Sequence, residues 1–208
     1  MILIGQYDSP FVRRVGIALT LYGLAFEHQP LSVFGDADAV RALNPLMRVP
    51  ALVLDDGFVL TDSHMILDYI DSLVPEGDAM FPRTEPDRHR ALKVAALATG
   101  LADKAVSLFY ERALHSVTSA TWEDRCRAQI VSVLGALEAD RAARPGPWWF
   151  GPRIGHADIA VACALRFAGD AHPGLIDPKS TPALAAHAAA CEAMPVFQQI
   201  SQPFVRPA

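Results

Sequence analysis

The chain has 208 residues, of which 51% are hydrophobic and 20% are charged, and its formal net charge is −5. This composition excludes an intrinsically disordered chain, because disorder requires few apolar residues and a high net charge. It also argues against a dedicated nucleic-acid binder, since 18 Lys+Arg stand against 23 Asp+Glu and such proteins carry a basic face. No apolar run approaches the roughly 20 residues that span a bilayer, and the N-terminus lacks the basic start of a secretory signal. We therefore expect a cytoplasmic protein with no nucleic-acid or membrane partner.

The predicted elements of the first half alternate between strands and helices. Asp55-Asp56-Gly57 has the chemistry of a hairpin turn between two short strands, and Gly23 is suited to end a helix. The order β-α-β-α-β-β-α indicates a mixed sheet covered by helices. The strands are expected over residues 1–7, 25–31, 51–54 and 58–60, and the helices over residues 10–23, 36–43 and 63–73.

The second half contains only helix signals. Its segments are rich in Ala and Leu, and Pro and Gly are confined mainly to their junctions. The fold class is therefore a small α/β domain followed by an all-α domain. The helices are expected over residues 86–113, 122–143, 156–169 and 181–193.

Charge and proline content place the boundary between the two domains. Residues 1–80 carry 4 Lys+Arg and 11 Asp+Glu, a balance of −7, whereas residues 81–208 carry 14 and 12, a balance of +2. Pro75, Pro82 and Pro86 lie close together at the junction, and prolines this dense stop helices. We predict domains at residues 1–75 and 87–208, joined by a linker at residues 76–86.

The cysteines give a further constraint on the chemistry. Cys126, Cys163 and Cys191 are odd in number and widely spaced, and no CxxC motif or Cys/His pair accompanies them. A disulfide framework and a zinc site are both disfavoured, and we expect no metal. All three cysteines lie in the second half, so residues 1–125 contain no thiol.

Ser9 stands where the first predicted strand ends and the first predicted helix begins. A serine followed by a proline, here Pro10, is a common helix N-cap, which is the simplest interpretation. The same position would allow the hydroxyl to donate to an anion that the helix dipole and the unpaired N–H groups also stabilise. Arg13 and Arg14 either add positive charge nearby or are merely solvated on the helix surface.

Pro50 stands at the entry to the strand over residues 51–54, where the missing N–H of a proline is tolerated. Only about 5–6% of X-Pro bonds in folded proteins are cis, so the residues alone do not establish a cis bond. If the Val49–Pro50 bond is cis, the turn leaves the N–H and C=O of Val49 available to pair with a peptide-like ligand as a strand would.

Asp62 and Ser63 precede the apolar helix over residues 63–73. Helix capping explains two short polar residues at this place. The N–H and hydroxyl of Ser63 would also form a socket for a carboxylate, and Asp62 beside it could hold an ammonium group. A ligand with an amine next to a carboxylate would satisfy both.

Taken together, these segments resemble the cytosolic glutathione transferase superfamily, in its bacterial, serine-type form. The resemblance covers nearly the whole chain. It implies a thioredoxin-like N-terminal domain, an all-helical C-terminal domain, a cis Pro50 and a homodimer. Asp158 resembles the family's structural cap, although Gly155 offers no side-chain acceptor where the family usually has Ser or Thr. The segments are SPFVRRVGIAL with LYGLAFE, NPLMRVPAL, LTDSHMILDYID and WFGPRIGHADIAVACAL.

The resemblance also implies a set of site residues. Ser9 would be the catalytic residue, because it falls where serine-type members hydrogen-bond the sulfur of glutathione. Tyr7 is a second candidate for this contact, unless its ring points into the core. Val49 would pair with the cysteinyl backbone, Asp62 and Ser63 would bind the γ-glutamyl group, and Arg48 would contact the glycyl end. The complete expected glutathione-binding set is Ser9, Phe11, Arg48, Val49, Pro50, Asp62 and Ser63.

The implied activity is a glutathione S-transferase, in which glutathione is a co-substrate and a small electrophile binds in a pocket from the helical domain. A glutathione-dependent isomerase or reductase shares the scaffold, but exchange through a protein thiol is disfavoured because no cysteine lies near Ser9. A non-catalytic binding or regulatory protein of the same fold is the third possibility.

Overall fold

Four short strands form a mixed sheet in the order β2-β1-β3-β4. They are β1 (Ile2–Ile4), β2 (Glu27–Gln29), β3 (Ala51–Val53) and β4 (Val59–Thr61). Strand β1 pairs in parallel with β2 and antiparallel with β3, and β3 and β4 form an antiparallel hairpin. The mixed sheet predicted from the sequence is confirmed in this computed structural model, which describes residues 1–205.

The register of the sheet places three strand ends in one row. Ile4, the last residue of β1, is paired with Ala51, the first residue of β3. Ala51 is in turn paired with Thr61, the last residue of β4. The chain segments that follow β1, precede β3 and follow β4 therefore leave the sheet from the same edge, although they are far apart in the sequence.

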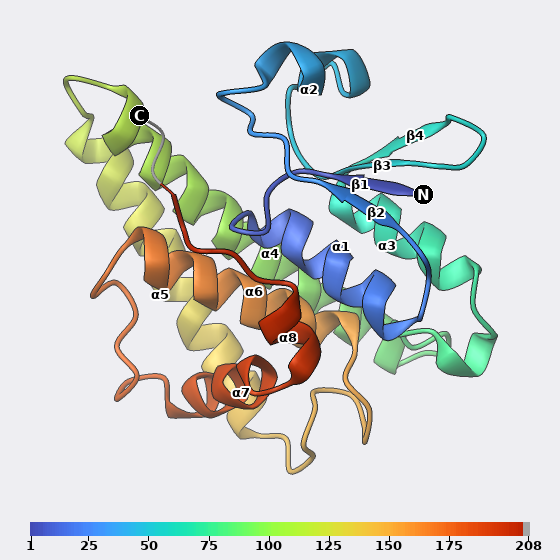
Figure 1. Cartoon of the computed structure of the whole chain (residues 1–208). Coiled ribbons are helices and arrows are strands. Elements are labelled where there is room, and N and C mark those ends of the chain that lie inside the picture. The colour runs from blue at the N-terminus through green and yellow to red at the C-terminus, as the bar shows by residue number, and fades with distance from the viewer. Residues whose placement is uncertain (206–208) are drawn as a thin grey trace. The chain divides into compact units, whose positions relative to one another are not determined.

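Helices cover both faces of this sheet. Figure 1 shows α1 (Pro10–Leu21) and α3 (Ser63–Ser72) beneath the strands and α2 (Ala37–Leu43) above them. The side chains of α1 and α3 that face the sheet are apolar and buried, which is the pattern expected for helices packed on a sheet. The buried core of this unit consists of Leu3, Val12, Val15, Ala18, Leu19, Leu52, Ile66, Leu67 and Ile70.

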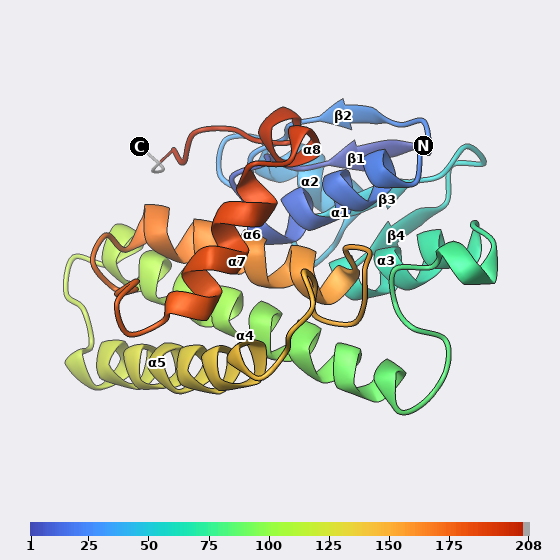
Figure 2. The same cartoon turned by 90° about the horizontal axis from the view of Figure 1, so that it is seen from below.

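The helical unit contains the four helices predicted from the sequence. They are α4 (Asp87–Leu114), α5 (Ala120–Ala142), α6 (His156–Ala171) and α7 (Pro182–Glu192). Helices α4 and α5 lie side by side in Figures 1 and 2. Helix α6 is buried along almost its whole length, which its Ala-rich sequence permits because small side chains allow close approach of neighbouring helices. Within the described residues, no helix is both long and apolar enough to cross a bilayer.

Asp158 caps α6, as expected. Its Oδ2 atom accepts a hydrogen bond from the N–H of Gly155 at 2.9 Å, and its Oδ1 atom accepts one from the N–H of Trp149 at 2.8 Å. The side chain of Trp149 is buried, so the carboxylate joins the start of α6 to the loop before it. Because Gly155 has no side chain, the reciprocal half of a capping box is missing.

The last helix differs from the predicted domain organisation. The described residues divide into one unit of Met1–Met80 with Met194–Pro203 and a second unit of Phe81–Ala193 with Phe204 and Val205. The predicted helical domain covers residues 87–208, whereas α8 (Pro195–Gln199) and the residues up to Pro203 pack with the sheet unit. The physical reason is that Phe197 and Ile200 are buried there. Residues 206–208 of the predicted domain lie outside the described residues.

Candidate functional site

Ser9 is the N-cap of α1. Its backbone is extended, with φ −69° and ψ 124°, and its Oγ atom accepts a hydrogen bond from the N–H of Val12 at 3.4 Å. The carbonyl oxygen of Ser9 accepts the first hydrogen bond of the helix, from Arg13, at 2.9 Å. A hydroxyl that accepts through a lone pair keeps its own proton for a further acceptor. Ser9 therefore places a donor at the positive end of a helix, where an anion is stabilised.

Gly5 lies where the start of α1 and the loop before β3 pack close together. Its φ is +119°, which L side chains rarely adopt, and a Cβ atom at this position would lie 2.6 Å from Cγ2 of Val12 and 2.7 Å from Cβ of Val49. The close approach of these two residues therefore requires a glycine. Gly5 is not among the residues predicted for the site, although a single glycine inside a predicted strand, here residues 1–7, is a signal for close backbone approach.

The loop before β3 carries a cis Val49–Pro50 bond, as the resemblance implied. Asn44, whose side chain is buried, holds this loop by donating from Nδ2 to the carbonyl oxygen of Arg48 at 2.7 Å. Pro50 is buried, Val49 is half-buried and Arg48 is exposed. Because the paired residues of β3 begin at Ala51, Val49 lies outside the strand ladder, at the edge of the sheet.

Asp62 connects the end of β4 to α3 in a strained conformation. Its φ of 67° and ψ of 126° are unusual for a residue with a side chain, and such conformations cost about 1–3 kcal/mol. Its Oδ1 atom accepts a hydrogen bond from the N–H of His64 at 2.8 Å, so Asp62 is the N-cap of α3. Asp62 is exposed, whereas Ser63 is only 3% exposed. Strain that is kept at a helix start is typical of binding sites.

The residues predicted for the site come together at one edge of the sheet. Ser9 follows β1, and Val49 and Pro50 precede β3, with Gly5 between the two segments. Asp62 and Ser63 directly follow Thr61, whose partner Ala51 follows Pro50. Phe11 is half-buried in the first turn of α1, and Arg48 adds the exposed cation of this edge.

Tyr7 points away from the cap of α1. Its ring stacks on His28 with a centroid separation of 3.8 Å and an interplanar angle of 11°. A Cβ atom on Gly16 would lie 2.8 Å from Cε1 of Tyr7, so the ring reaches a point on α1 about 10 Å beyond Ser9 along the helix axis. Burial raises the pKa of Tyr7 to about 12, which keeps the phenol protonated. Of the two candidates for the sulfur contact, these contacts favour Ser9.

Arg13 and Arg14 are not solvated on the surface of α1, and that interpretation was wrong. Arg13 is 3% exposed and Arg14 is 1% exposed. The Nε atom of Arg13 donates to the carbonyl oxygen of Ile200 at 2.9 Å, and its Nη2 atom donates to that of Phe197 at 2.8 Å. The guanidinium thus binds the C-terminal segment. The residues around Arg13 in the sequence do not indicate these carbonyl partners, because both partners are more than 180 residues away along the chain.

The protein's own thiols lie outside the sheet unit. Cys126, Cys163 and Cys191 are all buried and belong to the helical unit. In the part of the chain that the structure describes, no group of three or more His, Cys, Asp or Glu side chains could hold a metal ion.

Comparison with known proteins gives matches over both units. Residues 3–78 match the family model described as Glutathione S-transferase, N-terminal domain, and residues 120–190 match Glutathione S-transferase, C-terminal domain. The uncharacterized GST-like protein YibF of Escherichia coli (strain K12) is 31% identical over 167 residues, which are 80% of this chain and 81% of that protein. Maleylacetoacetate isomerase of Pseudomonas aeruginosa is 31% identical over 175 residues, 79% of this chain and 80% of that enzyme.

A solved structure agrees with these matches. The crystal structure of a glutathione transferase family member from Pseudomonas fluorescens Pf-5, with bound glutathione, is 34% identical to this chain. It superposes with a TM-score of 0.83 over 98% of this chain and 99% of the other. The likeness therefore covers the sheet unit and the helical unit alike.

Proposed function

We propose that this chain, which belongs to the glutathione S-transferase family, binds glutathione at the edge of its sheet and transfers the glutathione thiolate to a small electrophile. The observation that carries the proposal is the position of the Ser9 hydroxyl at the N-terminus of α1, next to the loop of Val49 and cis Pro50. The glutathione bound to the Pseudomonas fluorescens relative supports the choice of ligand.

Each part of the tripeptide has a partner of matching chemistry at this edge. The main chain of Val49, outside the strand ladder, pairs with the cysteinyl backbone. The start of α3 at Ser63 receives the γ-glutamyl carboxylate, and the exposed carboxylate of Asp62 receives the ammonium group. The exposed guanidinium of Arg48 attracts the glycyl carboxylate. Phe11 and Pro50 complete the proposed contact set.

Ser9 makes the bound thiol reactive. A cysteine-type thiol has a pKa near 8.5, so only a few per cent of it is ionised at pH 7. Donation from the Ser9 hydroxyl and the dipole of α1 both favour the thiolate. Lowering the pKa by about two units corresponds to roughly 2.7 kcal/mol, which one charge-assisted hydrogen bond and a helix dipole together supply. The thiolate then attacks the electrophile, and the electrophile's leaving group departs with its electron pair.

Three measurements on the wild-type protein test this function, and the third is the rate at which glutathione is conjugated to an aromatic halide. Calorimetry measures glutathione binding, and the ultraviolet absorbance of the thiolate, followed from pH 5 to 10, measures its ionisation when bound. We expect binding, a lowered thiol pKa and conjugation of an aromatic halide. A protein that binds no glutathione, or binds it with the pKa of the free thiol, would contradict the proposal.

Glutathione-dependent isomerisation is a second candidate, favoured by the relationship to a maleylacetoacetate isomerase over 80% of that enzyme. In this reaction the thiolate adds to a cis double bond, the resulting single bond rotates, and the thiolate leaves to give the trans product. Glutathione is therefore consumed in conjugation and regenerated in isomerisation. Measuring glutathione consumed per product formed, with an aromatic halide and with a maleyl-type acid, separates the two activities.

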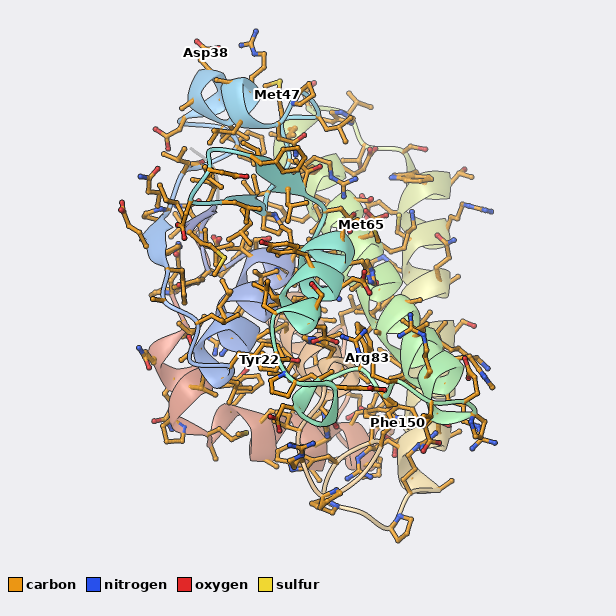
Figure 3. All side chains as sticks on the ribbon, turned by 90° about the vertical axis from the view of Figure 1, so that its right-hand side faces the viewer. Tyr22, Asp38, Met47, Met65, Arg83 and Phe150 are labelled. Atoms are coloured by element: carbon orange, nitrogen blue, oxygen red, sulfur yellow. The ribbon has the colours of Figure 1, made fainter. Side chains whose placement is uncertain are left out.

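The proposal includes a homodimer formed through the sheet unit. Large apolar side chains are exposed there, namely Leu46 at 72%, Phe58 at 62% and Met65 at 58%. Figure 3 shows Met65 on α3 and Met47 beyond α2, both on the side turned to the viewer. We propose that they gather in the interface, because a contiguous patch of exposed apolar side chains is typical of a surface that binds another protein. Light scattering is expected to give the mass of a dimer for the wild type and that of a monomer for Phe58→Asp/Met65→Asp; a monomeric wild type would contradict this part.

A further inference from the structure

The C-terminal segment Met194–Pro203 returns to the sheet unit and packs along α1. In Figures 1 and 2, α8 lies beside α1. Phe197 is fully buried and Ile200 is 4% exposed. The two hydrogen bonds from Arg13 hold the carbonyl oxygens at these same two positions, and the guanidinium also lies 5.4 Å from the ring centroid of Phe197. The segment is therefore fixed at two successive points.

Beyond these two points the segment reaches the loop that carries Ser9. The N–H of Tyr7 donates to Oε1 of Gln202 at 2.9 Å, across 195 positions of the chain. Gly16 enables this approach, since a Cβ atom at its position would lie only 3.0 Å from Cγ2 of Ile200. Gln202 is thus a side chain of the C-terminal segment bound directly to the main chain two residues before Ser9.

The same loop is held on its other side by β2. An imidazole nitrogen of His28, Nε2, lies 2.7 Å from the carbonyl oxygen of Gly5, and the ring of His28 stacks on Tyr7. Within the loop, the N–H of Ser9 donates to the carbonyl oxygen of Gln6 at 3.1 Å. The short turn between β1 and α1 is therefore bound at Gly5 by a neighbouring strand and at Tyr7 by the C-terminal segment.

We propose that Gln202 is a positioning residue for Ser9, which it acts on through the main chain of Tyr7, and that Arg13 holds the segment that delivers it. This inference rests on the proposed function of Ser9 as the donor to the glutathione sulfur. A donor contributes to thiolate stabilisation only while it is held at hydrogen-bond distance and angle from the sulfur. Without the hydrogen bond from the Tyr7 N–H to Gln202, the turn samples orientations that move the Ser9 hydroxyl away from the sulfur, while the contacts at Val49 and Asp62 stay in place.

Gln202→Met tests this role, because it keeps the length of the side chain and removes the amide oxygen. We expect kcat to fall on the order of tenfold, while the Kd for glutathione is nearly unchanged. A fall of this size is reasonable because a 1 Å misplacement of a catalytic group lowers the rate by roughly 100-fold. The pKa of the bound thiol rises toward that of free glutathione. The Tyr7 amide exchanges hydrogen faster than in the wild type, which reports the broken bond directly.

Two variants serve as controls. Gln202→Glu keeps an oxygen acceptor and is expected to restore protection of the Tyr7 amide and most of kcat. Gln199→Met makes the same substitution on the exposed part of α8 and is expected to behave as the wild type.

Three results would overturn the inference, and they are distinguishable. A Gln202→Met protein with a rapidly exchanging Tyr7 amide but unchanged kcat and thiol pKa rejects the role of Gln202 and leaves that of Ser9 intact. The same rejection follows if kcat falls equally in Gln199→Met. If the wild type binds no glutathione, the proposed function fails first and the role of Gln202 fails with it.

Discussion

Arg13 and Ile200 lie 187 positions apart in the chain and are joined by a 2.9 Å hydrogen bond from a guanidinium nitrogen to a carbonyl oxygen. A second bond from the same guanidinium reaches Phe197. Both bonds are buried, so each carbonyl oxygen would be left without a partner if the cation were removed. The stability of the sheet unit therefore depends on a segment that follows the four helices α4 to α7 in the chain.

Arg13→Ala is expected to destabilise the protein by about 3 kcal/mol, because two charge-assisted hydrogen bonds are lost in a buried place. Urea unfolding measures this change, and limited proteolysis is expected to cut first near residues 194–203. The control is Arg41→Ala on α2, which removes an exposed ion pair with Asp38 and is expected to cost less than about 0.5 kcal/mol. Equal losses in the two variants would contradict the contribution of the two buried hydrogen bonds to stability.

Ser9→Ala is expected to raise the pKa of bound glutathione by one to two units, roughly 1.4–2.7 kcal/mol, and to lower conjugation at pH 7 accordingly. It also removes a helix cap, which costs about 1 kcal/mol of stability. Ser119→Ala separates the two effects, because Ser119 caps α5 in the same way, accepting from the N–H of Trp122 at 3.3 Å. Ser9→Thr retains the hydroxyl and is expected to retain activity. If Ser9→Ala behaves like Ser119→Ala, Ser9 is only a cap.

Gly5→Ala is expected to cost more than about 2 kcal/mol and to weaken glutathione binding, because the new methyl group collides with Val12 and Val49 and φ is positive. Gly57→Ala is the matched control. Gly57 also has a positive φ, of +85°, but a Cβ atom there meets nothing within 4 Å, so only backbone strain of about 1 kcal/mol is added. Unfolding curves and glutathione titrations of both variants measure the difference. Equal effects would mean that the collision is relieved without cost.

His187 and Asp158 are expected to have opposite effects on stability below pH 7. Burial lowers the pKa of His187 to about 4, from the 6.5 of an exposed histidine. The contribution of the neutral ring to folding stability is therefore full above about pH 6.5 and is lost as the pH falls toward 4, because the unfolded chain takes up the proton first. Burial raises the pKa of Asp158 to about 6, against the hydrogen bonds from Gly155 and Trp149. The contribution of Asp158 is therefore full at low pH and is lost as the pH rises through 6. Between pH 7.5 and 5 the two changes largely offset each other.

His187→Gln reveals this compensation. From pH 7.5 to 5, the variant is expected to gain about 2 kcal/mol of stability relative to the wild type, because the cost of keeping a buried histidine neutral disappears. Urea unfolding at several pH values measures the gain. His89→Gln is the control at a side chain that is 66% exposed, and it is expected to change stability by less than about 0.5 kcal/mol. Parallel pH profiles for His187→Gln and the wild type would contradict the assignment.

The sequence predicts the elements of the sheet unit well, because their signals are local. The helix from Pro10 and the hairpin turn at Gly57 follow from residues within one or two turns of the chain. The site segments around Ser9, Pro50 and Asp62 are likewise recognisable. Their assembly at one edge is not local, since it depends on the pairing of Ile4 with Ala51 and of Ala51 with Thr61.

The C-terminal segment was not predictable in the same way. Its helix is only five residues long, and its apolar residues Phe197 and Ile200 do not indicate which unit they pack on. The burial of Arg13 depends on the same distant partners, so a cation in the first helix was expected at the surface. Gly5 was missed for a related reason: its role depends on Val49, which is distant in the sequence.

The sheet unit, residues 1–80 and 194–203, contains no cysteine and so contributes no protein thiolate to the ultraviolet absorbance. Cys126, Cys163 and Cys191 are each no more than 1% exposed, and burial raises the pKa of Cys126. A thiolate signal that appears near neutral pH when glutathione is added therefore belongs to the ligand. The same separation of the cysteines from the sheet unit allows a reporter cysteine placed beside Ser9 to be labelled selectively, without first removing any of the native thiols.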